Sequence, residues 1–286
     1  MWMNRFKTVL LLGALSALLL LVGSLFGGQA GLQLALIMAL VMNFIAYFFS
    51  EKIVLRMYRA QPLDPAEYGW IHAIVQELSA SMQIPEPKLW LIKTPMANAF
   101  ATGRDPQHAS VAVTTGILEI LDRDELRGVL AHELSHIKNR DVLVATIAAT
   151  IATAIGYLAH MMQYAAFSNR RNKNGGSPIA MFLVAILMPL AATLIQLAIS
   201  RSREYLADET GAHVCRDPLA LASALQKLHT NIPHAHMDSH DMQHASTASL
   251  FIVHPFTTDS WLAWFSTHPP MRSRVERLHA MCEKMF

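Results

Sequence analysis

Two histidines stand four residues apart in the segment "HELSH", which runs from His132 to His136. In a helix this spacing places both imidazoles on one face, where they can bind one Zn²⁺ ion. Glu133 is turned towards the edge of the same cleft and can take a proton from a water molecule at the metal without binding the metal. The pattern fixes only three residues, and a chain of this length contains it by chance about one time in a hundred. The surrounding sequence must therefore support the predicted zinc site.

A mononuclear zinc hydrolase needs a third protein ligand and an open position for water. The segment "SRSREYLADETG", Ser200 to Gly211, places Glu204 and Asp208 one turn apart on one helical face. We assign Glu204 to the metal and expect Asp208 to accept a hydrogen bond from a ligand histidine. The alternative is a surface helix whose acidic residues face water. Asp141, five residues after His136, is a parallel candidate for holding a histidine, or else a charge at a membrane edge.

The "HELSH" segment has a strong helix start. Asp122 is followed three residues later by Glu125, which resembles a capping box, and Asp124 adds negative charge near the positive end of the helix dipole. We therefore expect a helix over residues 124–139. By periodicity and flanking residues, further helices are expected over 64–82, 117–121, 204–213, 218–229 and 270–285.

Three short β-type runs precede this helix: "PKLWLIK", "ANAFATG" and "ASVAVTT". Pro, Gly and Asp residues separate them, which is typical of strands joined by turns. We expect a small antiparallel sheet from about Pro87 to Thr115. Together with the helices, this predicts an α+β domain around the metal.

The chain is unusually apolar for a soluble protein, with 53% hydrophobic and 15% charged residues. Residues 8–50 contain no charged residue and divide at "GGQAG", residues 27–31, into two runs that are each long enough to cross a bilayer. Residues 142–169 and 174–200 also lack Asp, Glu, Lys and Arg. The sequence thus predicts a multi-pass membrane protein with four membrane-inserted helices. A cleaved signal peptide over residues 8–26 is the alternative, but the second run follows at once and would have to be exported.

These segments divide the chain into an N-terminal transmembrane hairpin (1–50), the first part of a metalloprotease domain (51–141), a second transmembrane hairpin (142–200) and the second part of that domain (201–286). Basic residues flank the first hairpin on both sides, so both flanks should be cytoplasmic. Basic residues also occupy the loop of the second hairpin, residues 170–173, so this hairpin either crosses fully or enters only partway. We favour the full crossing.

The net charge of +2 gives no reason to expect nucleic acid as a partner. Two isolated cysteines, Cys215 and Cys282, have no framework spacing, which fits a reducing compartment.

The motifs together resemble one family. "NAFATG", "HELSH", "SRSREYLAD" and "THPPMRSRVERL" occur in this order, with two apolar segments before "HELSH" and two between "HELSH" and "SRSREYLAD". This arrangement resembles the HtpX family of bacterial membrane-bound zinc endopeptidases, which are related to the CAAX prenyl protease. The resemblance covers nearly the whole chain.

The resemblance implies a gluzincin-type domain on the cytoplasmic side of the inner membrane, one zinc ion per chain, and a role in degrading damaged or misassembled membrane proteins and unfolded polypeptides. It also implies that the segment beginning Asn98, Ala99 and Phe100 is an edge strand that pairs with an extended substrate. His268, in the last motif, is a candidate donor to the oxyanion of the reaction, or else a histidine that caps the following helix.

Two alternatives stay open from the residues alone. The run "HAHMDSHDMQH", His234 to His244, can bind adventitious metal, although a solvated loop fits its spacing better. The rival to the protease is a non-proteolytic membrane protein, such as a metal transporter or a scaffold, in which the same residues bind zinc structurally. Such a protein should carry charged residues or histidines inside its spans, and His160 is the one such residue.

Overall fold

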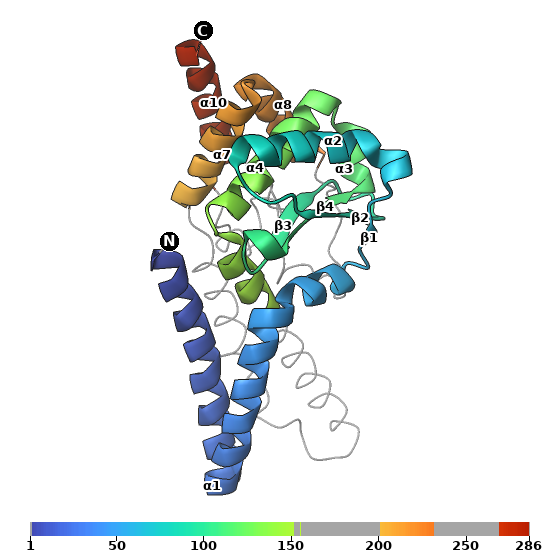
Figure 1. Ribbon diagram of the computed structural model, residues 1–286. Helices are drawn as coiled ribbons and strands as arrows, with labels where there is room; N and C mark the ends of the chain where they lie inside the picture. The colour runs from blue at the N-terminus through green and yellow to red at the C-terminus, as the bar shows by residue number, and fades with distance from the viewer. Residues whose placement is uncertain (1, 152–154, 156–200, 232–268, 286) are drawn as a thin grey trace, which may run out of the picture.

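The computed structural model describes residues 2–151, 155, 201–231 and 269–285. In these residues a helical hairpin projects from a domain of helices and one sheet (Figure 1). The elements are α1 (Trp2–Met57), β1 (Gln61–Pro62), α2 (Pro65–Met82), β2 (Lys88–Ile92), β3 (Ala99–Gly103), the 3₁₀ turn Pro106–His108, β4 (Ala109–Thr114), α3 (Thr115–Ile120), α4 (Arg123–Lys138), the apolar helix Val142–Ile151, α7 (Arg201–Cys215), α8 (Pro218–Thr230) and α10 (Met271–Met285).

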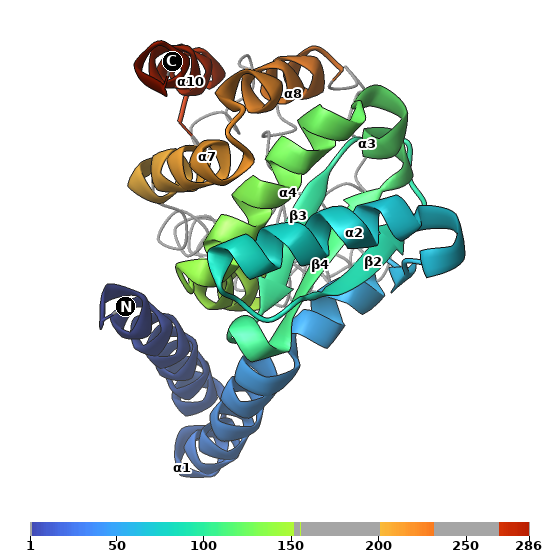
Figure 2. The same ribbon diagram turned by 45° about the horizontal axis from the view of Figure 1, so that its top comes forward.

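Helix α1 consists of two arms that meet at Gly28. This residue has φ 53° and ψ −135°, a conformation that glycine adopts without a Cβ clash. The chain reverses there, and the arms run alongside each other in both views (Figures 1 and 2). Asn43 Nδ2 donates a hydrogen bond of 2.8 Å to Ser16 Oγ between the arms. The break lies within residues 27–31, where the sequence predicts it.

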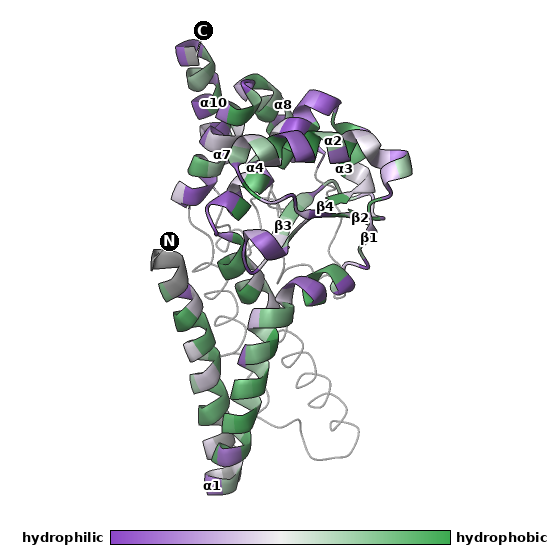
Figure 3. Ribbon diagram, in the orientation of Figure 1, coloured by the Kyte–Doolittle hydropathy of each residue, from purple (hydrophilic) through white to green (hydrophobic). Residues whose placement is uncertain are grey.

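The surface of α1 is largely apolar (Figure 3). Large hydrophobic side chains from Phe6 to Phe49 are exposed along both arms. Among the described residues, one helix, Gly28–Met57, is long and apolar enough to cross a membrane, and Phe6–Leu21 and Val142–Ile151 are shorter apolar helices. Most of the second predicted hairpin lies outside the described residues, so the prediction of four spans stays a prediction.

The sheet corrects one expectation from the sequence. We predicted an antiparallel sheet, but it is mixed: the strand order is β1-β2-β4-β3, and β2 and β4 are parallel. The chain runs from β2 out to the edge strand β3 and returns through β4, which inserts between them. Local patterns indicate strands and turns, but this insertion depends on packing between distant segments. Strand β1 has only two residues and was not predicted.

Both faces of the sheet are covered. Residues alternate along each strand, so one set faces the core formed with α2 and α4, and the other faces the end of α1 and the apolar helix Val142–Ile151. The first set contains Leu89, Leu91, Ala99, Ala101, Val111 and Val113, and the second contains Trp90, Ile92, Phe100 and Ala112. The edge strand β3 is therefore buried although it has a neighbour on one side only.

Helix α4 lies at the centre of the domain, between β3 and α2 on one side and α7 and α8 on the other (Figure 2). Glycines allow close packing: a Cβ at Gly128 would lie 3.1 Å from Leu221 Cα in α8, and one at Gly211 in α7 would lie 3.0 Å from His132 N. Helix α10 packs on α7 and α8. One hydrophobic core thus contains residues from both sides of the undescribed stretch 156–200.

Candidate metal centre

Helix α4 positions the first two candidate ligands. Its N-terminus forms the predicted capping box, in which Asp122 accepts from Glu125 N and Glu125 accepts from Asp122 N. His132 and His136 lie one turn apart further along this helix, and their Nε2 atoms face each other at 3.2 Å. His132 is 1% exposed, so its imidazole has little contact with solvent.

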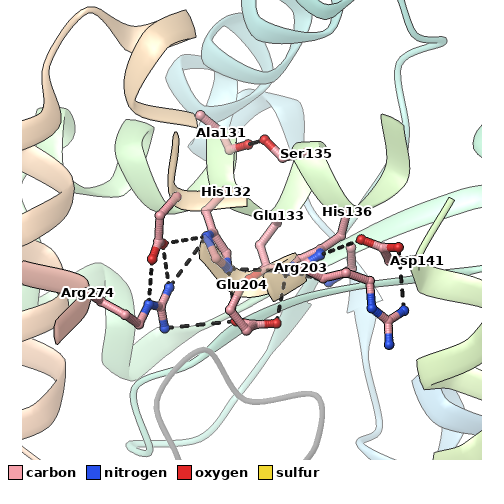
Figure 4. A network of polar contacts seen from close by, with 11 residues as sticks. Ala131, His132, Glu133, Ser135, His136, Asp141, Arg203, Glu204 and Arg274 are labelled. Carbon is pink, nitrogen blue, oxygen red and sulfur yellow. Dashed lines mark hydrogen bonds and ion pairs between the residues drawn. The ribbon is translucent and has the colours of Figure 1, made fainter. Parts of the chain in front are cut away.

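Helix α7 brings the third candidate ligand to this pair. Glu204 Oε2 lies 3.6 Å from His132 Nε2, and Glu204 Oε1 lies 3.6 Å from His136 Nε2 (Figure 4). One possible ligand atom from each of these three residues falls within 4.8 Å of the others. Among the described residues, this is the one group of His, Cys, Asp or Glu side chains that could hold a metal ion. The structure therefore brings together three residues, from two helices, that the sequence analysis assigned to the metal.

The ring nitrogen of His132 that faces away from this group is held by a buried pair. Asp208 Oδ1 lies 2.9 Å from His132 Nδ1. Arg274, from α10, donates to both oxygens of Asp208, with Nη2 2.6 Å from Oδ1 and Nε 2.7 Å from Oδ2. Such a bidentate contact fixes the orientation of the carboxylate and so favours the His132 tautomer that leaves Nε2 free to bind a cation.

His136 has a similar but looser arrangement. Asp141 Oδ2 lies 3.5 Å from His136 Nδ1, and Arg203 Nη1 lies 3.4 Å from Asp141 Oδ1 (Figure 4). Asp141 is buried, with 6% exposure, although it lies just before the apolar helix Val142–Ile151. In both cases, the candidate ligand histidine contacts an aspartate, and that aspartate contacts an arginine from another helix.

Glu133 lies beside the metal group and contacts the sheet. Its side chain is buried, and Oε2 accepts a hydrogen bond of 2.9 Å from the backbone N–H of Ala101 in β3. This N–H is directed away from β4, so it belongs to the unpaired edge of the sheet. Glu133 therefore connects the candidate metal centre to the edge strand.

Burial and charge shift the pKa values of these groups. Burial by itself lowers the pKa of His132, but hydrogen bonds to Asp208 and Glu204 outweigh it and raise this pKa to about 9. Burial raises the pKa of Glu133, which suits a base that acts near neutral pH. Burial alone would raise the pKa of Asp208, but the charge and hydrogen bonds of Arg274 outweigh burial, so this pKa lies below its usual range. A metal ion binds the neutral imidazole, so protons compete with a metal for His132.

The segment predicted to bind the substrate begins at Asn98, the residue before the edge strand, and continues into that strand. The backbone N–H of Asn98 donates to Thr114 Oγ1, and its carbonyl accepts from Thr114 N, so its backbone is bound to the sheet. The ring of Phe100 lies 5.5 Å from that of Tyr58, on the sheet face away from α4. Ala99 is fully buried. His268 lies outside the described residues, as does the histidine-rich run.

The sequence analysis did not assign Arg274 or Arg203 to the site. Arg274 carried a signal, because it falls on the apolar stripe of its helix, together with Met271, Val275 and Leu278. A charged residue on such a stripe must find a buried partner, but the sequence does not show which one. Arg203 directly precedes the candidate ligand Glu204, and nothing comparable in the sequence indicated its role.

Comparisons with known proteins identify the family of this chain. The family profile described as Peptidase family M48 matches residues 65–282. Three curated relatives are each described as a protease HtpX homolog. The one from Sulfurihydrogenibium sp. (strain YO3AOP1) is 49% identical and covers 99% of this chain and 97% of its own. The one from Persephonella marina (strain DSM 14350 / EX-H1) is 50% identical, with 99% of each chain covered. The one from Aquifex aeolicus (strain VF5) is 50% identical, with 94% and 90% covered.

The fold also resembles the crystal structure of S. mikatae Ste24p, with a TM-score of 0.52 and 16% sequence identity. That match covers 97% of this chain and 65% of the Ste24p chain. The likeness in fold agrees with the sequence relationship. The sequence relationship alone favours the protease over a transporter or scaffold. With relatives at about half identity over nearly their full length, the chain belongs to peptidase family M48 and is an HtpX-like metalloprotease.

Proposed function

We propose that this metalloprotease is a zinc-dependent endopeptidase of the bacterial inner membrane that cleaves damaged or misassembled membrane proteins and unfolded polypeptides on the cytoplasmic side. The observation that carries the proposal is the convergence of His132, His136 and Glu204 within 4.8 Å, beside the buried carboxylate of Glu133.

The donor set fits zinc. Two imidazole nitrogens and one carboxylate are the ligands of several catalytic zinc sites, whereas Ca²⁺ and Mg²⁺ prefer oxygen ligands. The Nδ1 atoms of both histidines face carboxylates, which favours ring orientations with Nε2 directed at the cation. His132, His136 and Glu204 would hold one ion per chain. When bound, zinc supplies a Lewis acid that lowers the pKa of water and polarises the scissile carbonyl.

Glu133 acts as the general base in this proposal. It takes a proton from the attacking water and returns it to the leaving amine. Burial supports this role because it raises the pKa of the carboxyl, so that the group accepts and releases a proton more readily near neutral pH.

Strand β3 supplies the surface for the substrate. Its pairing with β4 uses one edge, and the other edge carries the N–H of Ala101, which donates to Glu133. An extended substrate that adds to this edge would lie beside the metal ligands, as in other cases of strand addition. Asn98, Ala99 and Phe100 are the residues proposed to bind the substrate. Ala99 alternates with the paired residues and offers backbone groups to the substrate, whereas the side chain of Phe100 packs against the end of α1 and the apolar helix Val142–Ile151.

The apolar surface of α1 supports a position in the bilayer. Exposed Leu, Ile, Val and Phe side chains cover both arms of α1, as is expected of helices surrounded by lipid. Basic residues on either side of the hairpin support a cytoplasmic position for the domain and both termini. Membrane proteins that fail to fold would then be the available substrates.

A cleavage assay tests this function. Purified protein loaded with zinc should cleave an unfolded polypeptide, and a chelator should abolish the cleavage. Glu133→Gln should keep its zinc and its melting temperature but lose nearly all turnover, because the base is removed and the ligands are not. Glu204→Ala should lose zinc, since it leaves two protein ligands.

Two results would contradict the assignment. Loss of zinc in Glu133→Gln in parallel with activity would make Glu133 structural. Full zinc content in Glu204→Ala would place the third ligand elsewhere. Glu209→Ala, an exposed glutamate on the same helix, is the matched control and should behave like the wild type.

A further inference from the structure

Arg274 is an arginine with almost no contact with solvent. Its side chain is 1% exposed, in the middle of the buried stripe of α10. A buried guanidinium is stable in a protein only where anions and hydrogen-bond acceptors surround it. Its described anionic neighbours are Asp208, with two contacts of 2.6 and 2.7 Å, and Glu204, whose Oε2 lies 4.0 Å from Nη1.

These contacts make a continuous connection from the C-terminal helix to the candidate ligands. Arg274 fixes both oxygens of Asp208, and Asp208 contacts His132 Nδ1 at 2.9 Å. The three residues come from α10, α7 and α4, and Arg274 Nη2 also lies 3.5 Å from His132 Nδ1 (Figure 4). The carboxylate of Asp208 cannot rotate about the Cβ–Cγ bond without losing a hydrogen bond to the guanidinium of Arg274.

Helix α10 has a second contact with α7. The guanidinium of Arg277 lies over the ring of Tyr205, 4.1 Å from its centroid. This contact lies at the surface, since Arg277 is exposed, and it touches no candidate ligand. Arg274 and Arg277 thus differ in what they contact: Arg274 binds Asp208, which contacts His132, whereas Arg277 holds the helix against Tyr205 of α7.

We propose that Arg274 is a positioning residue through which the docked C-terminal helix completes the metal centre. It orients Asp208, which orients His132, so that metal affinity depends on a residue more than 130 positions away from the "HELSH" helix. The inference rests on the proposed zinc site. It predicts that removal of the Arg274 guanidinium weakens metal binding even where the domain stays folded.

The test measures zinc affinity by competition with a chelating dye, on the full-length protein in detergent. Arg274→Met should weaken zinc binding about 10- to 100-fold, the range seen for partners that orient metal ligands. It should also change the visible absorption spectrum of the Co²⁺-loaded protein, which reports the ligand geometry. Arg274→Lys should recover part of the affinity, since it restores the charge without the bidentate contact.

Two arginines on the same helix provide matched controls. Arg277→Met loses the contact with Tyr205, and Arg272→Met alters a side chain that is 91% exposed. Both variants should bind zinc within about twofold of the wild type. A loss of affinity in Arg277→Met as large as in Arg274→Met would mean that loosening α10 suffices, and would overturn a specific role for Arg274.

Arg274→Met leaves Asp208 as a buried, uncompensated charge and can fail to fold. The double variant Arg274→Met/Asp208→Asn removes that charge and keeps the test valid. If Arg274 acts through Asp208, the double variant should bind zinc as weakly as Asp208→Asn alone, and no more weakly. A further loss by the full factor of the single variant would overturn this route.

The outcomes distinguish a failure of the proposed role of Arg274 from a failure of the proposed zinc site. If wild-type protein binds no zinc, or if His132→Ala binds it as tightly as wild type, the proposed zinc site itself fails. If wild type binds zinc, His132→Ala does not, and Arg274→Met binds like wild type, only the role of Arg274 fails.

Discussion

The two glutamates beside the candidate ligand histidines differ in what they face. Glu204 has one oxygen 3.6 Å from each Nε2, so it can complete a set of metal ligands. Glu133 is next to His132 in sequence, but its carboxylate accepts from the N–H of Ala101 in the sheet. The different surroundings account for the different roles proposed for two residues of the same type.

His268 is the candidate for the oxyanion donor. A donor of this type acts on charge that develops in the transition state, so His268→Ala should lower kcat about 10²- to 10³-fold with zinc content and melting temperature nearly unchanged. Steady-state kinetics with a zinc assay and a thermal melt check this expectation. Early melting, or a normal kcat, would instead indicate that His268 only caps the helix that follows it.

Glu125 should make stability depend on pH. Its buried carboxylate accepts from Ser223 Oγ at 2.6 Å, Lys227 Nζ at 2.7 Å and the backbone N–H of Asp122 at 3.0 Å. Burial raises its pKa, but these contacts outweigh burial and hold the pKa below its usual range. A carboxyl with a lowered folded pKa stabilises the fold above its unfolded pKa, and this contribution is lost as the pH falls through the folded value.

Glu125→Gln should therefore lower the melting temperature near pH 7, by the equivalent of about 1–3 kcal/mol. The difference from wild type should shrink as the pH falls below about 4, near the reference value for glutamate. Glu77→Gln, which alters a 62% exposed carboxylate paired with Arg127, is the control and should have a small effect at every pH. A difference for Glu125→Gln that is constant with pH would show that its charge is not involved.

At the scale of elements, the packing of α7 on α4 sets the distance between Glu204 and the histidines. Gly211 lies against the backbone of His132, where a Cβ would be 3.0 Å from N and 3.3 Å from Cα. Gly211→Val should push the two helices apart by a few tenths of an ångström or more. We expect weaker zinc binding and a lower melting temperature. Gly69→Ala, in α2, has nothing within 4 Å of the new Cβ and should be neutral or slightly stabilising.

Affinity and melting temperature should be measured for both glycine variants. Wild-type zinc binding in Gly211→Val would show that the contact between α4 and α7 can adjust without disturbing the ligands.

The elements also show what the sequence could and could not predict. Helix starts were predictable because caps such as Asp122 and Asp64 act within one turn. The three candidate ligands could be proposed from the sequence because two share one helix turn and the third belongs to a motif, and the structure brings them together. The parallel pairing of β2 with β4, and the bond from Arg274 to Asp208, depend on which distant segments pack together. Local spacing contains no information of that kind, so these two features required the structure.

At the scale of the whole molecule, the expected orientation in the membrane can be tested with single cysteines. In a variant without Cys215 and Cys282, a membrane-impermeant reagent added outside the cell should label a cysteine placed at Gln29, beside the break in α1. It should not label one at Lys52 or Gln107, because the basic flanks retain those positions in the cytoplasm. Labelling at position 107 from outside would invert the topology while leaving the metal centre as described.

Very little chain separates α4 from the apolar helix that follows it. Helix α4 ends at Lys138, Arg140 adopts a left-handed conformation with φ 57°, and the next helix starts at Val142. His136 thus precedes this start by only six residues. Six residues span at most about 20 Å even when they are fully extended. Where Val142–Ile151 enters lipid, the proposed catalytic centre would therefore lie close to the bilayer surface, and the sites of cleavage would depend on how far a segment has emerged from the bilayer as much as on its side chains.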